Sequence, residues 1–193
     1  MESIQLTALS ELDAVNNIIG TIGESPIDTL DEMTDVDSQN ALRILRDISR
    51  QEQARGWSFN RIPFFTLTPT QDTKKIPWND TFLFLKALNP CRKLVRQGEY
   101  IKDLYRDSTT FEHPIAVELV LHIPFDQLPD QMRSYIVAKA CFVFQNSYFG
   151  DDSLTKVTQM QVQEAWQYLQ EYEIDNNNYS MLDHTYVRKL LLR

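Results

Sequence analysis

Residues 14–26 read AVNNIIGTIGESP, and this stretch closes the first amphipathic segment of the chain. The apolar side chains of that segment recur every three or four residues, at Leu9, Leu12, Val15, Ile19 and Ile22. This spacing predicts a helix over about residues 8–22 with one apolar face. Thr7 or Ser10 is expected to cap this helix, and Ser10 followed by Asp13 resembles a capping box with a shorter acidic residue.

The two glycines of this stretch are expected to have different roles. Gly23 lies just past the last apolar residue, where a helix commonly ends in the left-handed conformation, and Pro26 discourages the helix from resuming. Gly20 lies inside the predicted helix, where glycine costs roughly 0.5–1 kcal/mol relative to alanine. We therefore expect Gly20 to be a close-packing position between helices or between subunits.

Three further segments have helical periodicity: one precedes the strand-like region between residues 57 and 123, and two follow it. Helices are predicted over about residues 37–55, 130–148 and 154–172. The side chains expected to face inward on the last two are Met132, Ile136, Ala140, Val143 and Phe144, then Leu154, Val157, Val162, Ala165, Leu169 and Tyr172. The run from Asp175 through Asn178 is expected to break any helix.

Between residues 57 and 123, short apolar or β-branched runs alternate with proline, glycine and asparagine, which predicts antiparallel strands. The run 82–88 is ambiguous and also fits a helical turn. The predicted fold class is α+β: a four-helix bundle with an inserted antiparallel β lobe and an extended C-terminal tail. The expected divisions are 1–56 for the first two helices, 57–125 for the lobe, 126–175 for the last two helices and 176–193 for the tail.

The net charge of −8 is unevenly distributed along the chain. Residues 1–50 and 111–181 each carry ten acidic and three basic residues, whereas residues 51–110 carry six acidic and ten basic ones. This pattern does not fit a sequence-reading DNA-binding protein, which has a broad basic face. No transmembrane segment or secretory signal is expected, and Cys91 and Cys141 are expected to be reduced.

No motif for catalysis, nucleotide binding or metal binding is present, so we expect no catalytic, cofactor-binding or metal-binding residues. His113, His122 and His184 have no zinc-like spacing, and we expect a structural role for His122. One alternative remains open. Glu112, Glu118 and Asp126 lie near aromatic residues that stack on sugars, so the lobe could be a hydrolase of glycan or peptidoglycan. The aromatic candidates are Trp78, Tyr100 and Tyr105.

The end of the chain, residues 179–193, reads YSMLDHTYVRKLLLR and is both apolar and basic. Three consecutive leucines would expose apolar surface if this segment had no partner. It is therefore expected either to fold back on its own domain or to dock on another protein.

Several segments together resemble the tail tubular protein A (tail adaptor) family of short-tailed, T7-like bacteriophages. They are AVNNII at 14–19 with IGESP at 22–26, NALRIL at 40–45, RGWSFN at 55–60, Leu128-Pro129 with RSYIV at 133–137, Phe144-Gln145 with Phe149-Gly150, and NYSMLD at 178–183. They follow the family's order and span nearly the whole chain. The stretch from about 62 to 118 resembles the family only loosely.

The resemblance implies a structural virion protein, assembled in the host cytoplasm, that forms a ring of twelve subunits between the portal protein and the tail nozzle (tubular protein B). Genomic DNA would pass through the ring without sequence-specific binding. The β lobe would face the nozzle or the tail fibres, and no membrane or cofactor is implied. The tail would dock on the portal, with these residues as portal-binding candidates: Tyr179, Met181, Leu182, Tyr186, Arg188, Leu190, Leu191, Leu192 and Arg193.

Overall fold

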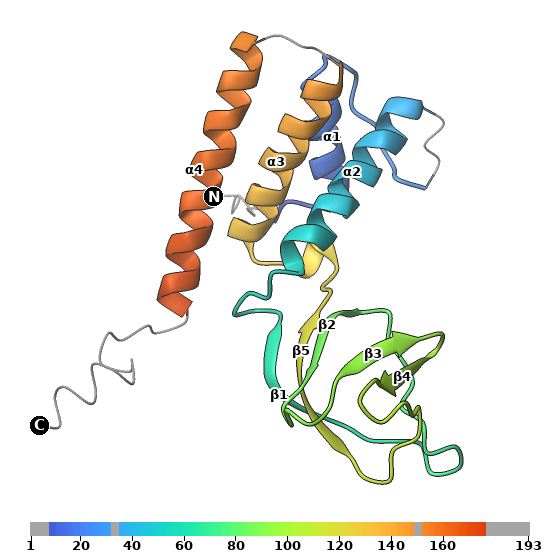
Figure 1. Ribbon diagram of the computed structural model, residues 1–193. Helices are drawn as coiled ribbons and strands as arrows, with labels where there is room; N and C mark the ends of the chain where they lie inside the picture. Colours follow the sequence, from blue (N-terminus) through green and yellow to red (C-terminus); the bar gives the residue numbers. More distant parts are fainter. Residues whose placement is uncertain (1–7, 32–34, 149–151, 177–193) are drawn as a thin grey trace, which may run out of the picture. The chain divides into compact units, whose positions relative to one another are not determined.

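The computed structural model describes residues 8–31, 35–148 and 152–176, and its secondary structure is mixed (Figure 1). The chain divides into two compact units. The helical unit combines Met1–Leu45 with Pro129–Arg193, and the sheet unit is Arg46–Leu128. The α+β class expected from the sequence is confirmed.

The helical unit is built around α3 (Asp130–Tyr148), which packs against α1 (Glu11–Gly20) on one side and α4 (Asp152–Asn176) on the other. The first part of α2 (Val36–Gln53) belongs to the same unit, and the Tyr148 hydroxyl donates a hydrogen bond to Asp37 at its start. The expected four-helix bundle is not confirmed, because the principal packing runs from α1 through α3 to α4.

The central position of α3 explains why its buried residues lie all around it, since two helices cover it. Ile136, Ala140 and Phe144 have no exposed surface, as expected. Two details of the prediction are wrong: Val143 is 40% exposed, and Val157 on α4 is 55% exposed. Helix α4 also continues to Asn176, four residues beyond the expected end, so the expectation that the helix breaks at Asp175 is wrong. Asp and Asn are weak helix formers, but their cost per residue is small enough for a helix to continue through them.

Residues 14–26 form the larger part of α1 and the tight turn that ends it. The expected capping box is present: the Asp13 amide donates to Ser10 Oγ at 3.1 Å, and the Ser10 amide donates to the Asp13 carboxylate at 3.1 Å. Gly23 is left-handed (φ 83°), and the amide of Glu24 donates to the Ile19 carbonyl across the closing turn. Gly23 therefore ends the helix, as predicted.

Asn16 holds the segment that follows this turn. Its side-chain amide donates to the Ile27 carbonyl at 3.0 Å, and its side-chain oxygen accepts from the Ile27 amide at 2.8 Å. The conformation after Pro26 is thus fixed by a residue inside the helix.

Among the described residues, nothing packs closely against Gly20, so the structure gives no support to a packing role between helices of the same chain. The residue is exposed, and a Cβ built there meets no heavy atom of the described residues within 4 Å. Packing of Gly20 against another subunit stays a prediction.

Replacing Gly20 by alanine is expected to raise the free energy of unfolding by up to about 1 kcal/mol, because helical backbone favours alanine and the space is open. The matched change Gly23→Ala is expected to lower it by about 1–2 kcal/mol, because it forces a Cβ into the left-handed region. Urea denaturation of both variants measures the difference. A loss at Gly20 as large as that at Gly23 would show that the glycine is needed for packing.

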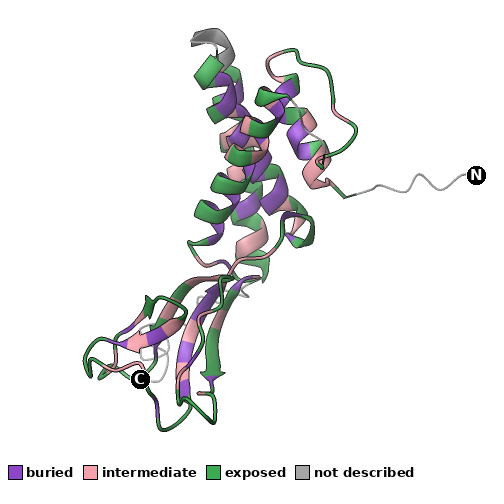
Figure 2. Cartoon of the chain, turned by 90° about the vertical axis from the view of Figure 1, so that its right-hand side faces the viewer, coloured by how far each residue is buried: buried purple, intermediate pink, exposed green. Residues whose placement is uncertain are grey.

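The sheet unit holds a three-stranded antiparallel sheet in the order β1-β5-β2, from Arg61–Leu67, Ile115–Leu121 and Phe82–Ala87. A separate hairpin pairs β3 (Leu94–Gln97) with β4 (Tyr100–Asp103). The expected antiparallel lobe is present, and the ambiguous run at 82–88 is a strand up to Ala87. In Figure 2 the strands carry buried residues beside half-buried and exposed ones. The core of this unit is Leu67, Ile76, Ala87, Leu94, Ile101, Phe111, Ile115, Val117 and Leu119.

The RGWSFN stretch at 55–60 joins the end of α2 to β1. Gly56 is left-handed (φ 78°), and a Cβ there would lie 2.9 Å from Val120 Cγ2. The buried Asn60 side chain accepts from the Trp57 amide at 2.8 Å and donates to the carbonyls of Gln53 and Leu121, both at 2.9 Å. This stretch is therefore a structural junction inside the sheet unit.

Candidate docking surfaces

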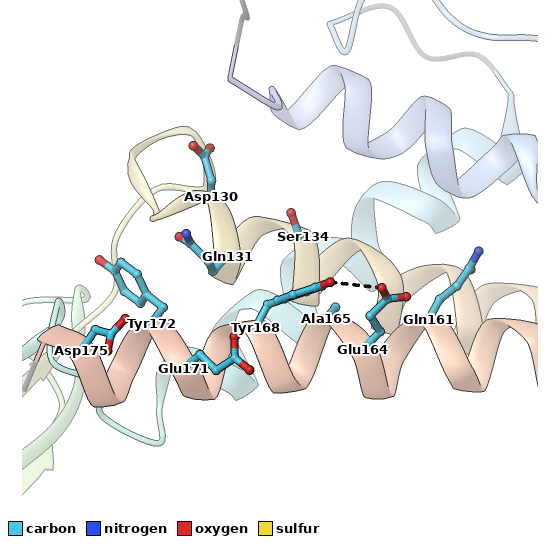
Figure 3. Close-up of a pocket in the computed structure, with 10 residues that line it drawn as sticks. All are labelled: Asp130, Gln131, Ser134, Gln161, Glu164, Ala165, Tyr168, Glu171, Tyr172 and Asp175. Atoms are coloured by element: carbon cyan, nitrogen blue, oxygen red, sulfur yellow. Dashed lines mark hydrogen bonds between the residues drawn. The ribbon is translucent and has the colours of Figure 1, made fainter.

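An open groove of about 630 Å³ runs between α3 and α4 in the helical unit (Figure 3). Its lining residues come from the start of α3 and the C-terminal half of α4: Asp130, Gln131, Ser134, Gln161, Glu164, Ala165, Tyr168, Glu171, Tyr172 and Asp175. Four of these carry carboxylates, and none of them is basic. We call this surface the acidic groove.

The acidic groove combines negative charge with aromatic surface. Tyr168 is 56% exposed, and its hydroxyl donates a 3.4 Å hydrogen bond to Glu164 one helical turn earlier. Asp130 pairs with Arg133 of α3. Carboxylates beside exposed aromatic rings favour a ligand that is cationic and apolar at once.

The same face of α4 continues toward its N-terminus as apolar surface. Val157, Met160, Glu164, Tyr168 and Glu171 are spaced three or four residues apart, which places them on one face. All five are exposed, Met160 by 68%. An exposed apolar patch rimmed by charge is typical of an interaction site.

The sheet unit carries a second groove, of about 380 Å³, with the opposite charge. Its lining includes Lys86, Arg92 and Lys93 together with Phe84 and Tyr105, and no acidic residue. Tyr105 is 65% exposed and Phe84 is 42% exposed. We call this surface the basic groove.

In the sheet unit, three cations lie over aromatic rings, and one of them, Arg92, also lines the basic groove. They are Lys75 over Tyr100 (4.8 Å), Arg96 over Trp78 (5.5 Å) and Arg92 over Phe111 (5.9 Å). Two of the aromatic residues proposed to stack on sugars, Trp78 and Tyr100, are therefore already covered by cations of the same unit.

The carboxylates of the hydrolase alternative gain no support from their surroundings. Glu118 on β5 accepts a 2.6 Å hydrogen bond from Arg61 Nε across the β1–β5 pair. Glu112 and Asp126 are exposed, one before β5 and the other in the 3-10 helix Phe125–Gln127. A glycosidase needs two carboxyl groups that flank one substrate-binding cleft. None of the three carboxylates lines either of the two grooves described above.

The surroundings of His122 and of the two cysteines give no indication of catalysis. Burial, with a contribution from Arg50, lowers the pKa of His122, which favours the neutral imidazole. Burial raises the pKa of the Cys141 thiol to about 11, and Cys91 is exposed. Among the described residues there is no group of three or more His, Cys, Asp or Glu placed to hold a metal ion. No helix in the described part of the chain is long and apolar enough to cross a membrane.

The expected portal-binding residues, Tyr179 through Arg193, lie outside the described residues. Sequence reasoning missed both grooves. The available signal for the acidic groove was the recurrence of Glu164, Tyr168, Glu171 and Asp175 every three or four residues. The basic groove is assembled from β2, the start of β3 and two loops, so no local pattern indicates it.

Exposed apolar side chains beside charged groups, on two surfaces of opposite charge, indicate a protein that docks on other proteins. Two comparisons support this class. A family model described as tail tubular protein matches residues 12–179. The chain is also 28% identical over 154 residues to tail tubular protein A of Klebsiella phage KP34, which covers 78% of this chain and 80% of the relative. The chain therefore belongs to the tail tubular protein family, whose members are structural components of phage tails.

Proposed function

We propose that this chain is the subunit of an adaptor ring that joins the phage portal to the tail nozzle and continues the channel through which DNA leaves. The ring has twelve copies, is assembled in the host cytoplasm and lies in the virion tail. A closed ring needs two different faces on each subunit, so that one face of each copy meets the other face of the next.

The observation that carries this proposal is the family match, which includes residues of both compact units. The two grooves support it, because a connector needs more than one docking surface. We assign the basic groove, on Lys86, Arg92 and Lys93, to the nozzle (tubular protein B) or the tail fibres. The net charge of −8 favours sliding of DNA over sequence-specific binding, since like charges repel phosphates.

The portal contact is assigned to residues 177–193, which follow α4. Deleting these residues is expected to abolish binding to purified portal rings while leaving the fold unchanged, because α4 ends at Asn176. Binding is measured by sedimentation of the truncated chain with portal rings, and folding by circular dichroism. Unchanged sedimentation with the portal would contradict the assignment of the tail.

A milder variant separates apolar docking from charge. Replacing Leu190, Leu191 and Leu192 by serine in the full chain removes the apolar surface and keeps all three basic residues of the segment. We expect portal binding to weaken at least tenfold, because three leucines bury about 1.5–3 kcal/mol each when fully covered. The matched control replaces Arg188 and Lys189 by glutamine, which leaves the apolar contact in place.

A further inference from the structure

We propose that the acidic groove holds residues 186–193 of the same chain while the subunit is free. The occupant reads YVRKLLLR and has three basic residues and no acidic one. This inference goes beyond the adaptor role, because it concerns the chain before it meets any partner.

The acidic groove needs a cationic, apolar occupant. Glu164, Glu171 and Asp175 lie on α4, and no lysine or arginine is among the described residues that line the groove. Tyr168 and Ala165 supply the apolar part of the lining. Burying such a surface against a polar or acidic segment would leave carboxylates unpaired, which is costly.

The order of residues in the segment fits the order of residues on α4. A chain that reverses direction after Asn176 runs antiparallel to α4, so it passes Asp175 and Glu171 first and Met160 and Val157 last. The segment presents Arg188 and Lys189 first and Leu190–Leu192 afterwards. Basic residues therefore meet the carboxylates, and the leucines meet the exposed apolar end of the same face.

The length of the chain beyond α4 is sufficient for this return. The groove extends from Asp175 to Gln161 along α4, about 21 Å at 1.5 Å per residue. Residues 177–193 reach up to about 56 Å when extended, at about 3.3 Å per residue. Enough chain remains to make the turn and to cover the groove.

The first test measures hydrogen exchange of the peptide containing residues 186–193 in the full chain without portal. We expect the Glu164→Gln/Glu171→Gln variant to exchange this peptide about fivefold faster than the unchanged protein, since two ion pairs are lost. The matched control is Gln163→Lys/Gln170→Lys, which changes the net charge equally but lies on exposed positions of α4 away from the groove. We expect the control to exchange like the unchanged protein. Equal exchange in all three proteins, or equal acceleration in both variants, would overturn the proposal.

The second test shows whether the acidic groove holds residues 186–193 of its own chain or those of another copy. Cysteines are placed at Met160, at the exposed apolar end of the face, and at Leu191 in a Cys91→Ser background, where Cys141 is buried. We expect oxidation at low micromolar concentration to give a cross-link within one chain. A cross-link between two chains, or none, would overturn the proposal in favour of a neighbouring copy or an unoccupied groove.

Portal binding is read separately, which keeps this inference distinct from the adaptor role. The Glu164→Gln/Glu171→Gln variant keeps every residue of the tail, so we expect it to sediment with portal rings at least as well as the unchanged protein. A portal-binding defect in this variant would show that the groove itself contacts the portal, and this would overturn the assignment of its occupant.

Discussion

Replacing Phe144 by alanine is expected to lower the free energy of unfolding of the helical unit by about 3–5 kcal/mol. Phe144 has no exposed surface, and its ring lies 4.7 Å from that of Tyr148. The change removes a large apolar side chain from the central helix and leaves a cavity that the surrounding helices fill only in part. Urea denaturation followed by far-ultraviolet circular dichroism measures the effect, because that signal comes mainly from helices.

The matched control is Val143→Ala, one residue earlier on the same helix. Val143 is 40% exposed, so its truncation is expected to change stability by less than about 0.5 kcal/mol. Similar losses for the two variants would contradict the assignment of Phe144 to the core and Val143 to the surface.

Replacing Gln53 by alanine is expected to lower the free energy of unfolding of the sheet unit by about 2–4 kcal/mol. Gln53 is fully buried at the end of α2. Its side-chain amide donates to Ser49 Oγ and to the Ile123 carbonyl, both at 3.0 Å, and its side-chain oxygen accepts from the Ile123 amide at 2.7 Å. Alanine would leave the backbone groups of Ile123 without these partners.

Gln51→Ala is the control for this change, since Gln51 lies on the same helix and is exposed. We expect it to leave stability unchanged. Urea denaturation is followed by tryptophan fluorescence in a Trp166→Phe background, so that the signal comes from Trp57 and Trp78 of the sheet unit. A loss below about 0.5 kcal/mol for Gln53→Ala would show that these hydrogen bonds are replaced by water.

The sequence predicted the structure well where a feature depends only on residues that are close together in the chain. The spacing of apolar residues in α1 and the Ser10–Asp13 pair depend on neighbours within one helix, and the structure confirms both. The left-handed Gly23 belongs to the same group, because the turn that needs it follows directly from the helix end.

Features that depend on distant residues were predicted less well. Gly20 was expected to pack closely because a glycine in a helix is unfavourable, but no heavy atom of the described residues lies within 4 Å of a Cβ built there. Val143 and Val157 fit the inward face by periodicity, yet which face is covered depends on where α1 and α4 lie beside α3.

The buried hydrogen bonds of Gln53 and Asn60 in the sheet unit could not be predicted from sequence patterns, because they also depend on distant residues. Nothing in the neighbouring sequence indicates that Gln53 and Asn60 are buried. Asn60 bonds to Leu121, 61 residues away, and Gln53 bonds to Ile123, 70 residues away. RGWSFN contributed to the family resemblance as a motif, and the structure supplies its physical reason in the left-handed Gly56 and the buried Asn60.

The most direct test of the adaptor role is native mass spectrometry of purified portal rings mixed with an excess of this chain. We expect one discrete complex that contains the portal ring and twelve added copies, with negative-stain images showing a second ring on the axis of the first. A portal that gains no copies, or that gains a variable number without a second ring, would contradict the proposal.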